Sequence, residues 1–417
     1  MAARHSAFGV RTDGMRYSSL TGRVAGEGSD AWQVHDDAVE RIARGDDVIL
    51  LSIGDPDFET PAAIRRAANA ALGAGRTHYS PIGGEPPLRR AIAAESSRTL
   101  GAAIDSGQVT VFPGAQAALF GVTQCLFDAG DEVIVAEPTY VTYEAVLGAP
   151  GAKMVPVALS PENNFQLDPD ALARAVTPRT RGIILNFPHN PTGACLTADQ
   201  ARSVARLCRQ HDLWFVSDEV YSALYYTGKH HESPLSLPGM LDRGILISSL
   251  SKSHAMTGWR CGWAVTPPAL AGHLSNLARA MYFGVAQFIQ DAAAAAITSG
   301  GAELETIRSC YERRARLMVE GLSGLPGIKV RMPDAGMYLF ADVRGTGLDG
   351  KQFARALLDA TGVSVTPGEG FGQSGAGHVR ITLGTGDQRL SDACHRIARF
   401  AGTRGPRDRP VGSARLE

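Results

Sequence analysis

Lys252 offers the most distinctive chemistry in this sequence. Ser249 lies three residues before it and Arg260 eight residues after it, in the run Ser-Leu-Ser-Lys-Ser-His-Ala-Met-Thr-Gly-Trp-Arg. An enclosed lysine amine attacks carbonyl carbons, whereas hydroxyl and guanidinium groups bind phosphate. The spacing therefore predicts a phosphate-bearing cofactor that Lys252 holds covalently.

The position of Lys252 also sets it apart from the other lysines. It follows the apolar run 244–250, which indicates a buried parallel strand, and open α/β sheets bind ligands at the carboxyl ends of such strands. The other four lysines lie beside glycines or in segments that we expect to be exposed, namely Lys153, Lys229, Lys329 and Lys351. We therefore expect only Lys252 to be enclosed.

Asp218 ends another apolar run, Leu-Trp-Phe-Val-Ser-Asp-Glu-Val-Tyr, in which Tyr221 follows three residues later. A buried carboxylate needs a cation. A pyridinium nitrogen is such a cation, and a carboxylate beside it keeps the ring protonated as an electron sink. The alternative makes Asp218 the N-cap of a following helix and Tyr221 a packing residue. Taken alone, these two residues favour neither interpretation.

Two loops between apolar runs carry backbone and amide donors. In Asn-Phe-Pro-His-Asn-Pro-Thr-Gly, residues 186–193, the turn would direct the Asn190 amide over the sheet edge, where it can donate to a phenolate oxygen. In Phe-Pro-Gly-Ala-Gln, residues 112–116, the amides of Ala115 and Gln116 would lie at a helix N-terminus, a site that binds anions. Both patterns are also ordinary turns. The surrounding residues must decide whether these loops bind a ligand or are only turns.

Two tyrosines and an arginine are further candidates. Tyr140, in Glu-Pro-Thr-Tyr, would either stack on an aromatic cofactor or pack in the core. Arg380, on the short β pattern 377–383, would either clamp a carboxylate or form a surface salt bridge. Tyr79 lies in a glycine-bearing loop that is either exposed or reaches into a neighbouring subunit. These choices stay open at the level of sequence.

Composition argues against several classes of protein. The 417 residues carry 41 basic and 42 acidic side chains, so no strong field attracts nucleic acid or an anionic membrane. The first twenty residues contain no apolar block of signal-peptide type, and no run reaches the roughly 18 apolar residues of a membrane helix. The six cysteines are scattered without a C-x-x-C pair. We expect a cytoplasmic protein without a nucleic-acid, membrane or metal partner.

Short apolar runs alternate with helical patterns from about residue 109. The expected strands are 109–112, 132–136, 154–158, 182–187, 213–217 and 244–250. The expected helices between them are 115–127, 140–147, 168–175 and 197–209. This alternation predicts right-handed crossovers and a mostly parallel sheet that helices cover on both faces. The chemistry should then collect at the carboxyl ends of the strands.

A second, smaller α+β unit is expected after a long helical stretch at 285–320. Its expected strands are 328–332, 337–342, 363–365 and 378–383. We place a hinge near residue 300. The chain then divides into an N-terminal segment that belongs to the small domain, a large domain and a small C-terminal domain, at 1–58, 59–299 and 300–417. The predicted fold class is α/β, with a mostly parallel sheet in the large domain and a smaller α+β domain.

Together these motifs resemble the class I/II aminotransferases of fold type I, in the aspartate aminotransferase superfamily, which use pyridoxal 5'-phosphate (PLP). The similarity runs from about residue 15 to 400 and includes, in the family's order, Gly54-Asp-Pro-Asp-Phe-Glu-Thr-Pro61, Tyr79, Pro-Gly-Ala-Gln, Asn190-Pro-Thr-Gly, Asp218 with Tyr221, Ser249-x-x-Lys252 with Arg260, and Arg380. Each motif is weak alone, but their joint occurrence in this order is specific. One departure is His189, where the family usually has a second asparagine.

The resemblance implies roles for the residues around the cofactor ring. Lys252 would bind PLP covalently and then act as the general base, and Asp218 would pair with the pyridine nitrogen. Tyr221 and Asn190 would hydrogen-bond the ring oxygen, and Tyr140 would stack on the ring. Catalysis would therefore depend on Lys252, Asp218 and Tyr221.

The resemblance also implies a phosphate site and a substrate site. The phosphate would be bound by Ser249, Arg260, the amides of Ala115 and Gln116, and Tyr79 of a second subunit. The substrate α-carboxylate would be bound by Arg380, Asn190 and the backbone of Gly54. The active site would then require a homodimer.

Three stretches, 15–28, 136–146 and 249–263, look like the members of this family that transfer the α-amino group of arginine to pyruvate. An acidic group must then meet the guanidinium, and Glu27 and Asp30 are candidates, with solvated loop charges as the alternative. The same fold also serves aspartate or aromatic aminotransferases that use 2-oxoglutarate, and carbon–sulfur β-lyases. A transcription regulator built on this fold would need a DNA-binding domain ahead of the core, for which we expect no room.

Overall fold

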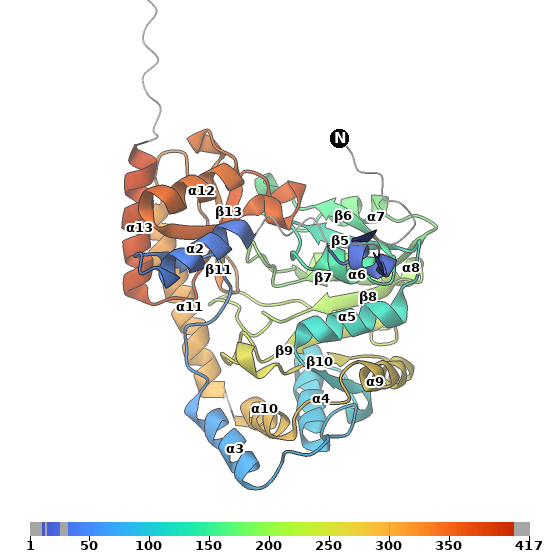
Figure 1. Cartoon of the computed structure of the whole chain (residues 1–417). Coiled ribbons are helices and arrows are strands. Elements are labelled where there is room, and N and C mark those ends of the chain that lie inside the picture. Colours follow the sequence, from blue (N-terminus) through green and yellow to red (C-terminus); the bar gives the residue numbers. More distant parts are fainter. Residues whose placement is uncertain (1–10, 13–14, 26–31, 300, 404–417) are drawn as a thin grey trace, which may run out of the picture.

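The computed structural model describes residues 11–12, 15–25, 32–299 and 301–403 of the chain. The described residues form a seven-stranded sheet, a four-stranded sheet and a pair of two-residue strands, β1 (Arg11–Thr12) and β2 (Met15–Arg16). Figure 1 shows the two large sheets side by side, each with its own helices. Residues far apart in the sequence can therefore meet where the sheets face each other.

The seven-stranded sheet has the order β4-β10-β9-β8-β7-β5-β6. Its strands are β4 (Val109–Phe112), β5 (Glu132–Glu137), β6 (Lys153–Ala158), β7 (Thr180–Asn186), β8 (Trp214–Asp218), β9 (Gly244–Ser249) and β10 (Gly262–Val265). Strands β6, β5, β7, β8 and β9 pair in parallel, whereas β10 pairs antiparallel with both β9 and β4. The predicted mostly parallel sheet is confirmed.

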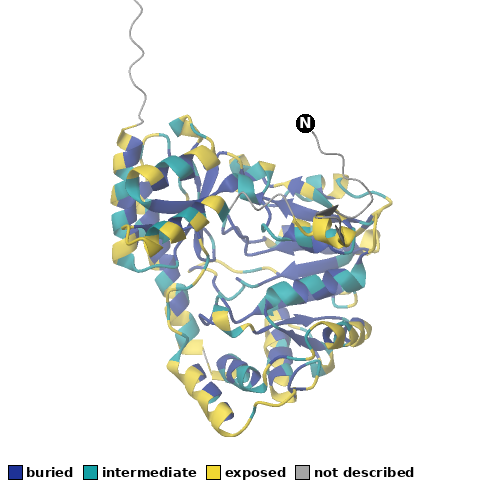
Figure 2. Ribbon diagram, in the orientation of Figure 1, coloured by how far each residue is buried: buried dark blue, intermediate teal, exposed yellow. Residues whose placement is uncertain are grey.

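Helices cover both faces of this sheet, because successive strand side chains point to opposite sides. Ile183 and Leu185 of β7 pack in one apolar cluster and Ile184 in another. The first cluster is completed by α3 (Ala62–Gly73), α4 (Pro86–Leu100), α7 (Pro169–Arg174), α8 (Ala198–Gln210) and α10 (Gln287–Ser299). The second is completed by α5 (Ala115–Leu126), α6 (Tyr143–Gly148) and α9 (Pro268–Met281). Figure 2 shows the strands between these helices as buried.

The four-stranded sheet has the order β11-β13-β12-β3. Its strands are β3 (Ile49–Leu51), β11 (Tyr338–Asp342), β12 (Val363–Pro367) and β13 (His378–Thr382). A third apolar cluster joins this sheet to α2 (Gln33–Ala43), α11 (Gly301–Leu322), α12 (Gly350–Thr361) and α13 (Asp387–Gly402). A short helix, α1 (Ser19–Arg23), instead lies on α6, where Arg23 Nε donates to the Gly148 carbonyl at 2.8 Å. We propose the domain division 1–58, 59–299 and 300–417 because β3, from the first segment, pairs with β12.

Some expected elements differ from the structure. The predicted strand 328–332 is wrong, because only Lys329 of that run pairs, in an isolated bridge with Asp342. Pro326 and Pro333, which lack a backbone N–H, bracket this run. The expected helical stretch 285–320 consists of two helices, α10 and α11. The sequence reasoning also missed β10, a four-residue strand that only a short 3-10 helix, Thr257–Trp259, separates from β9.

In the described part of the chain, no helix combines the length and the apolar character that crossing a membrane would require.

Candidate active site

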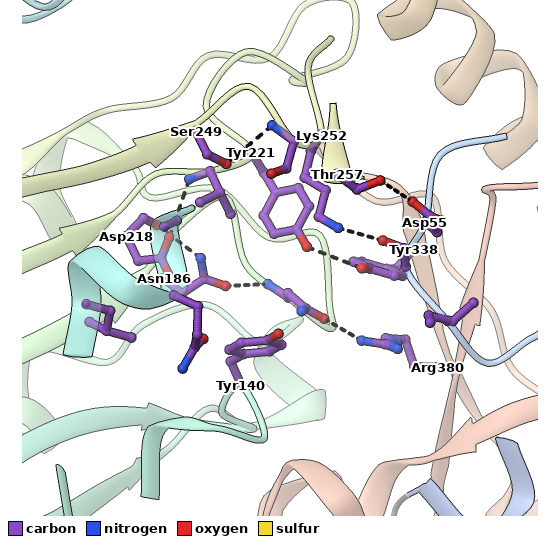
Figure 3. Close-up of a pocket in the computed structure, with 18 of the residues that line it drawn as sticks. Asp55, Tyr140, Asn186, Asp218, Tyr221, Ser249, Lys252, Thr257, Tyr338 and Arg380 are labelled. Atoms are coloured by element: carbon purple, nitrogen blue, oxygen red, sulfur yellow. Dashed lines mark hydrogen bonds between the residues drawn. The ribbon is translucent and has the colours of Figure 1, made fainter. Parts of the chain in front are cut away.

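A cavity of about 400 Å³ lies between the carboxyl ends of the large-sheet strands and the small sheet. Of the residues predicted to bind the cofactor or the substrate α-carboxylate, all but Tyr79 line it: Gly54, Ala115, Gln116, Tyr140, Asn190, Asp218, Tyr221, Ser249, Lys252, Arg260 and Arg380. In Figure 3, Asp218, Asn186 and Ser249 lie on one side of the cavity, and Tyr338 and Arg380 lie on the other. The structure thus brings together residues that are up to 326 positions apart, from Gly54 to Arg380.

Lys252 follows strand β9, as predicted, and points into this cavity (Figure 3). It is partly buried, whereas the other four lysines of the chain are exposed. Its Nζ atom donates a hydrogen bond of 2.6 Å to the carbonyl of Gly54. Ser249, the last residue of β9, is buried at the same end of the strand. The amine is therefore held at the junction between the two sheets.

Asp218 is the last residue of β8 and is buried. Its Oδ2 atom accepts a hydrogen bond of 2.7 Å from the Tyr143 hydroxyl, and its Oδ1 atom accepts one of 3.4 Å from the Val220 amide. Burial raises the pKa of Asp218 to about 6, and these two hydrogen bonds oppose that rise. The alternative role as a helix N-cap is wrong, because a turn and not a helix follows. Among the described residues, no cationic side chain forms an ion pair with this carboxylate.

Asn186 and Asn190 link the end of β7 to the same site. The Asn186 Nδ2 atom donates to the Asp218 carbonyl at 3.0 Å, and its Oδ1 atom accepts from the Asn190 amide at 3.0 Å. His189, the departure from the family pattern, stacks on Phe187 with ring centroids 5.1 Å apart. Burial lowers the pKa of His189 to about 4, so the ring is neutral near pH 7.

His189 links its own loop to the residue that follows β5. Its Nδ1 atom lies 2.7 Å from Thr192 Oγ1, and its Nε2 atom lies 2.9 Å from the carbonyl of Pro138. The neutral ring that donates from Nε2 satisfies both contacts, with Nδ1 as the acceptor. His189 itself does not line the cavity.

The loop before α5 and Arg260 form a cluster of donors at one end of the cavity. Gly114 has φ +94°, and α5 begins at Ala115, as predicted. A Cβ atom at Gly114 would lie 2.3 Å from the Arg260 Nη2 atom, and one at Gly262 would lie 2.4 Å from the Ala115 nitrogen. Both positions therefore require glycine. Amides at a helix N-terminus with a guanidinium beside them can bind an anion.

Arg380 lies in the middle of β13 and is only 4% exposed. Its Nη1 atom donates to Asn190 Oδ1 at 3.2 Å, and its Nη2 atom donates to the Ser52 carbonyl at 3.1 Å. The guanidinium carbon lies 4.4 Å from the ring centroid of Tyr338 and 4.9 Å from that of Phe371. In the described part of the chain, no carboxylate pairs with Arg380, and its buried Nε atom has no hydrogen-bond partner. The surface salt bridge that we considered is therefore wrong.

Three tyrosine side chains line the cavity. The hydroxyl of Tyr221 lies 3.2 Å from that of Tyr338, and both residues are buried. Tyr140 meets Tyr143 edge to face, with centroids 6.0 Å apart, and presents its ring to the cavity. A Cβ atom at Gly54 would lie 1.7 Å from the Tyr338 hydroxyl, so this glycine lets the loop approach the ring.

Tyr79 is the predicted site residue that the structure places elsewhere. It is 82% exposed and does not line the cavity. Its ring meets Phe283, which is 47% exposed, edge to face with centroids 5.0 Å apart. Glu27 and Asp30, the candidates for a guanidinium partner, lie outside the described residues.

The sequence profile of the family described as aminotransferase class I and II matches residues 46–397. The chain belongs to this family. The match contains every residue predicted to bind the cofactor or the substrate α-carboxylate, from Gly54 to Arg380. Class I and II aminotransferases act on amino acids and 2-oxo acids with PLP as the cofactor, so this chain is a PLP-dependent aminotransferase.

Relatives of this aminotransferase are similar over nearly their whole length. The arginine–pyruvate transaminase of Pseudomonas aeruginosa is 52% identical over 384 residues, which cover 92% of this chain and 98% of that protein. The aspartate aminotransferase of Pyrococcus horikoshii is 36% identical over 361 residues, which cover 86% and 92%. A solved structure of the Thermus thermophilus aspartate aminotransferase with maleate superposes with a TM-score of 0.87 at 35% identity, covering 92% and 100%. The fold is therefore PLP fold type I.

The cavity of this aminotransferase also contains residues that sequence reasoning missed. They are Trp32, Ile53, Asp55, Leu119, Asn186, Val220, Ser251, Thr257 and Tyr338. Several of them adjoin a recognised motif, as Asp55 adjoins Gly54 and Thr257 precedes Arg260. Trp32 and Tyr338 belong to no motif that we recognised, because they reach the cavity from the small sheet and its helix α2.

Proposed function

We propose that this aminotransferase moves the α-amino group of L-arginine to pyruvate, at the cavity between the two sheets. The 52% identity to an arginine–pyruvate transaminase over 92% of the chain supports the choice of substrates. The observation that carries the proposal is the buried guanidinium of Arg380, to which the described residues offer neutral acceptors but no carboxylate. A buried cation without an anion beside it is unfavourable, and a substrate α-carboxylate would neutralise it.

The cavity offers a partner of suitable chemistry for each polar part of PLP. The Asp218 carboxylate, which burial destabilises, suits a protonated pyridine nitrogen. The amides of Ala115 and Gln116, with Arg260 beside them, suit the phosphate. We propose that Tyr221 and Asn190 donate to the ring oxygen, that Ser249 also binds the phosphate, and that Tyr140 stacks on the ring. When bound, PLP withdraws electrons from the carbon that loses a proton.

Lys252 is the proton carrier in this proposal. Its Nζ atom would remove the proton from the substrate Cα, and the carbonyl of Gly54 keeps the amine inside the cavity by accepting its hydrogen bond of 2.6 Å. Arg380 would hold the α-carboxylate with Asn190 and the backbone of Gly54, so that the Cα proton faces the amine. Tyr338 packs under the guanidinium and excludes water from that end.

The cations of the cavity favour a substrate with a single carboxylate. Among the described residues that line it, only Lys252, Arg260 and Arg380 are cationic, and each has a role in the proposal. Among the described residues of the cavity, no fourth cation remains for the second carboxylate of aspartate or 2-oxoglutarate. Burying a second carboxylate without a cation beside it is unfavourable, and pyruvate, which has one carboxylate, does not require this. Aspartate or aromatic transamination with 2-oxoglutarate is the weaker alternative, supported by relatives of 36% identity.

We further propose a homodimer in which Tyr79 reaches the partner's phosphate site. Tyr79 and Phe283 are both exposed and form an aromatic pair on the surface, and exposed aromatic rings of this kind mark interfaces.

All six cysteines are free thiols, which supports a reducing, cytoplasmic location.

A panel of amino acids against pyruvate and 2-oxoglutarate tests the substrates, with the absorbance of bound PLP and the 2-oxo acid product as readouts. We expect arginine with pyruvate to give the highest kcat/KM. If arginine leaves the PLP absorbance unchanged, the arginine proposal is overturned, while the family stands. If 2-oxoglutarate is preferred to pyruvate, the argument from the count of cations is wrong.

A further inference from the structure

Ser52 is a buried junction behind the carboxylate site. Its carbonyl accepts hydrogen bonds from Arg380 Nη2 at 3.1 Å and from Thr366 Oγ1 at 2.7 Å. Its hydroxyl lies 2.8 Å from Ser364 Oγ and 2.9 Å from His35 Nδ1. Ser52 is 1% exposed, so water cannot replace these contacts. The Ser52 carbonyl is therefore one of three acceptors that hold Arg380, with Asn190 Oδ1 and Thr366 Oγ1, and three other side chains contact Ser52 itself.

The backbone ladder does not position Ser52 by itself. Strand β3 pairs with β12 only from Ile49 to Leu51, and Ser52 is the first residue beyond the ladder. The segment then continues to Gly54, whose carbonyl accepts the hydrogen bond from Lys252. Side-chain contacts therefore decide where the segment 52–54 lies, and with it the anchor of Arg380.

His35 is the contact that comes from outside the sheet. Ser364 and Thr366 belong to β12, whereas His35 belongs to helix α2. Ser364 donates to the Ser52 hydroxyl, whose own proton is then available for an acceptor. A neutral His35 with its proton on Nε2 supplies that acceptor at Nδ1. Burial lowers the pKa of His35, as does Arg380, whereas Asp36 raises it, and the neutral ring is accordingly favoured.

The start of the same helix also contributes to the lining of the cavity. Trp32, directly before α2, lines the cavity and meets the His35 ring edge to face, with centroids 5.7 Å apart and planes at 76°. The position of α2 therefore affects both the substrate space beside Trp32 and the carbonyl that holds Arg380.

We propose that His35 is a positioning residue for the carboxylate clamp: by holding the Ser52 hydroxyl, it sets the carbonyl that orients the Arg380 guanidinium. This inference rests on the proposed role of Arg380 in binding the substrate α-carboxylate. It gives α2, which contains no residue of a recognised motif, a defined effect on substrate binding.

The test compares His35→Ala with His35→Asn, whose amide oxygen restores an acceptor, in the PLP-loaded enzyme. For His35→Ala we expect KM for two donors of different side chain, arginine and alanine, to rise by the same factor, about threefold to tenfold, as the loss of one buried hydrogen bond implies. The inhibition constant of propionate, which offers little but a carboxylate, should rise by that factor too. We expect kcat to change by less than about twofold, because the reacting atoms keep their contacts.

Controls separate positioning from general damage. Val39→Ala changes an exposed residue of the same helix, 44% exposed, and should leave KM and the propionate constant unchanged. His35→Asn should recover most of the loss. If His35→Ala does not fold, Ser364→Ala removes the other hydroxyl contact of Ser52 and should raise the same two constants.

Three results would overturn the inference: unchanged constants in His35→Ala and Ser364→Ala, an effect on one donor only, or a fall in kcat at unchanged KM. Arg380→Ala distinguishes this failure from failure of the proposed function. If Arg380→Ala leaves the propionate constant unchanged, the carboxylate site itself is misassigned. If Arg380→Ala weakens the binding of propionate and the His35 variants do not, only the positioning role of His35 is refuted.

Discussion

The hydroxyl of Tyr143 should control the ionisation of Asp218. Tyr143 is buried and donates a hydrogen bond of 2.7 Å to Asp218 Oδ2. This bond lowers the pKa of Asp218, whereas burial raises it, with a net value of about 6. Tyr143→Phe removes the bond with little change in packing, so the carboxylate loses its main stabilising donor.

The size of the expected change in stability follows from the difference between the pKa of Asp218 in the folded protein and in the unfolded chain. The pKa of Asp218 rises from 3.8 in the unfolded chain to about 6 in the folded protein. Its contribution to stability is therefore present below pH 4 and is lost as the pH rises to 6, at about 1.4 kcal/mol per unit or about 3 kcal/mol in all. A hydrogen bond to a charged group contributes about 1.5 to 3 kcal/mol. Tyr143→Phe should hence raise the pKa of Asp218 to roughly 7 or above.

Urea unfolding of the PLP-free protein at pH 5 and pH 8 measures this effect. The free energy of unfolding lost in Tyr143→Phe should be larger at pH 8 by about 1.5 kcal/mol, because Asp218 is ionised only there. Tyr282→Phe is the matched control, since the Tyr282 hydroxyl donates to the Val111 carbonyl at 2.8 Å and no titrating group takes part. Equal losses at both pH values in Tyr143→Phe would refute the assignment.

Three further substitutions test the site. Lys252→Ala should lower kcat by more than about 10² while the thermal unfolding midpoint stays close to the wild type, because the lost group is a proton carrier and not a packing residue; near-normal turnover would contradict the proposed mechanism. Arg380→Ala should raise KM for every α-amino acid, and a loss confined to one donor would move Arg380 to the side-chain pocket. Gly54→Ala should cost about 1 to 3 kcal/mol of unfolding free energy, since its Cβ would lie 1.7 Å from the Tyr338 hydroxyl. Gly73→Ala is the control: no atom lies within 4 Å of the added carbon, so the unfolding free energy, measured for both variants by urea unfolding, should stay close to that of the wild type.

The positions of Asp218, Asn190 and Lys252 could be anticipated from sequence. Each follows an apolar run that forms a parallel strand, and the carboxyl ends of such strands meet at one edge of a sheet. The one lysine expected to be enclosed is also the one that the structure leaves partly buried. Local patterns sufficed here because strand direction and buried character are properties of short segments.

Residues that approach from other elements were not predictable in this way. Tyr143 lies in the expected helix 140–147, and its contact with Asp218 depends on how α6 packs on the sheet. The antiparallel strand β10 inserts between β4 and β9, although it follows them both in the chain. Strand order and helix docking depend on packing between distant segments, which no local pattern records.

The sequence by itself determined the reaction class of this protein, because a cofactor site requires particular side chains at the ends of particular strands and their order along the chain survives in the motifs. The tertiary structure alone decided what completes the site. It buries Arg380 with no carboxylate partner among the described residues, places Tyr338 against Gly54, and joins His35 to the hydroxyl of Ser52. These contacts arise where the two sheets and α2 meet, and burial at that junction sets both the charge that a substrate must carry and the groups that hold it.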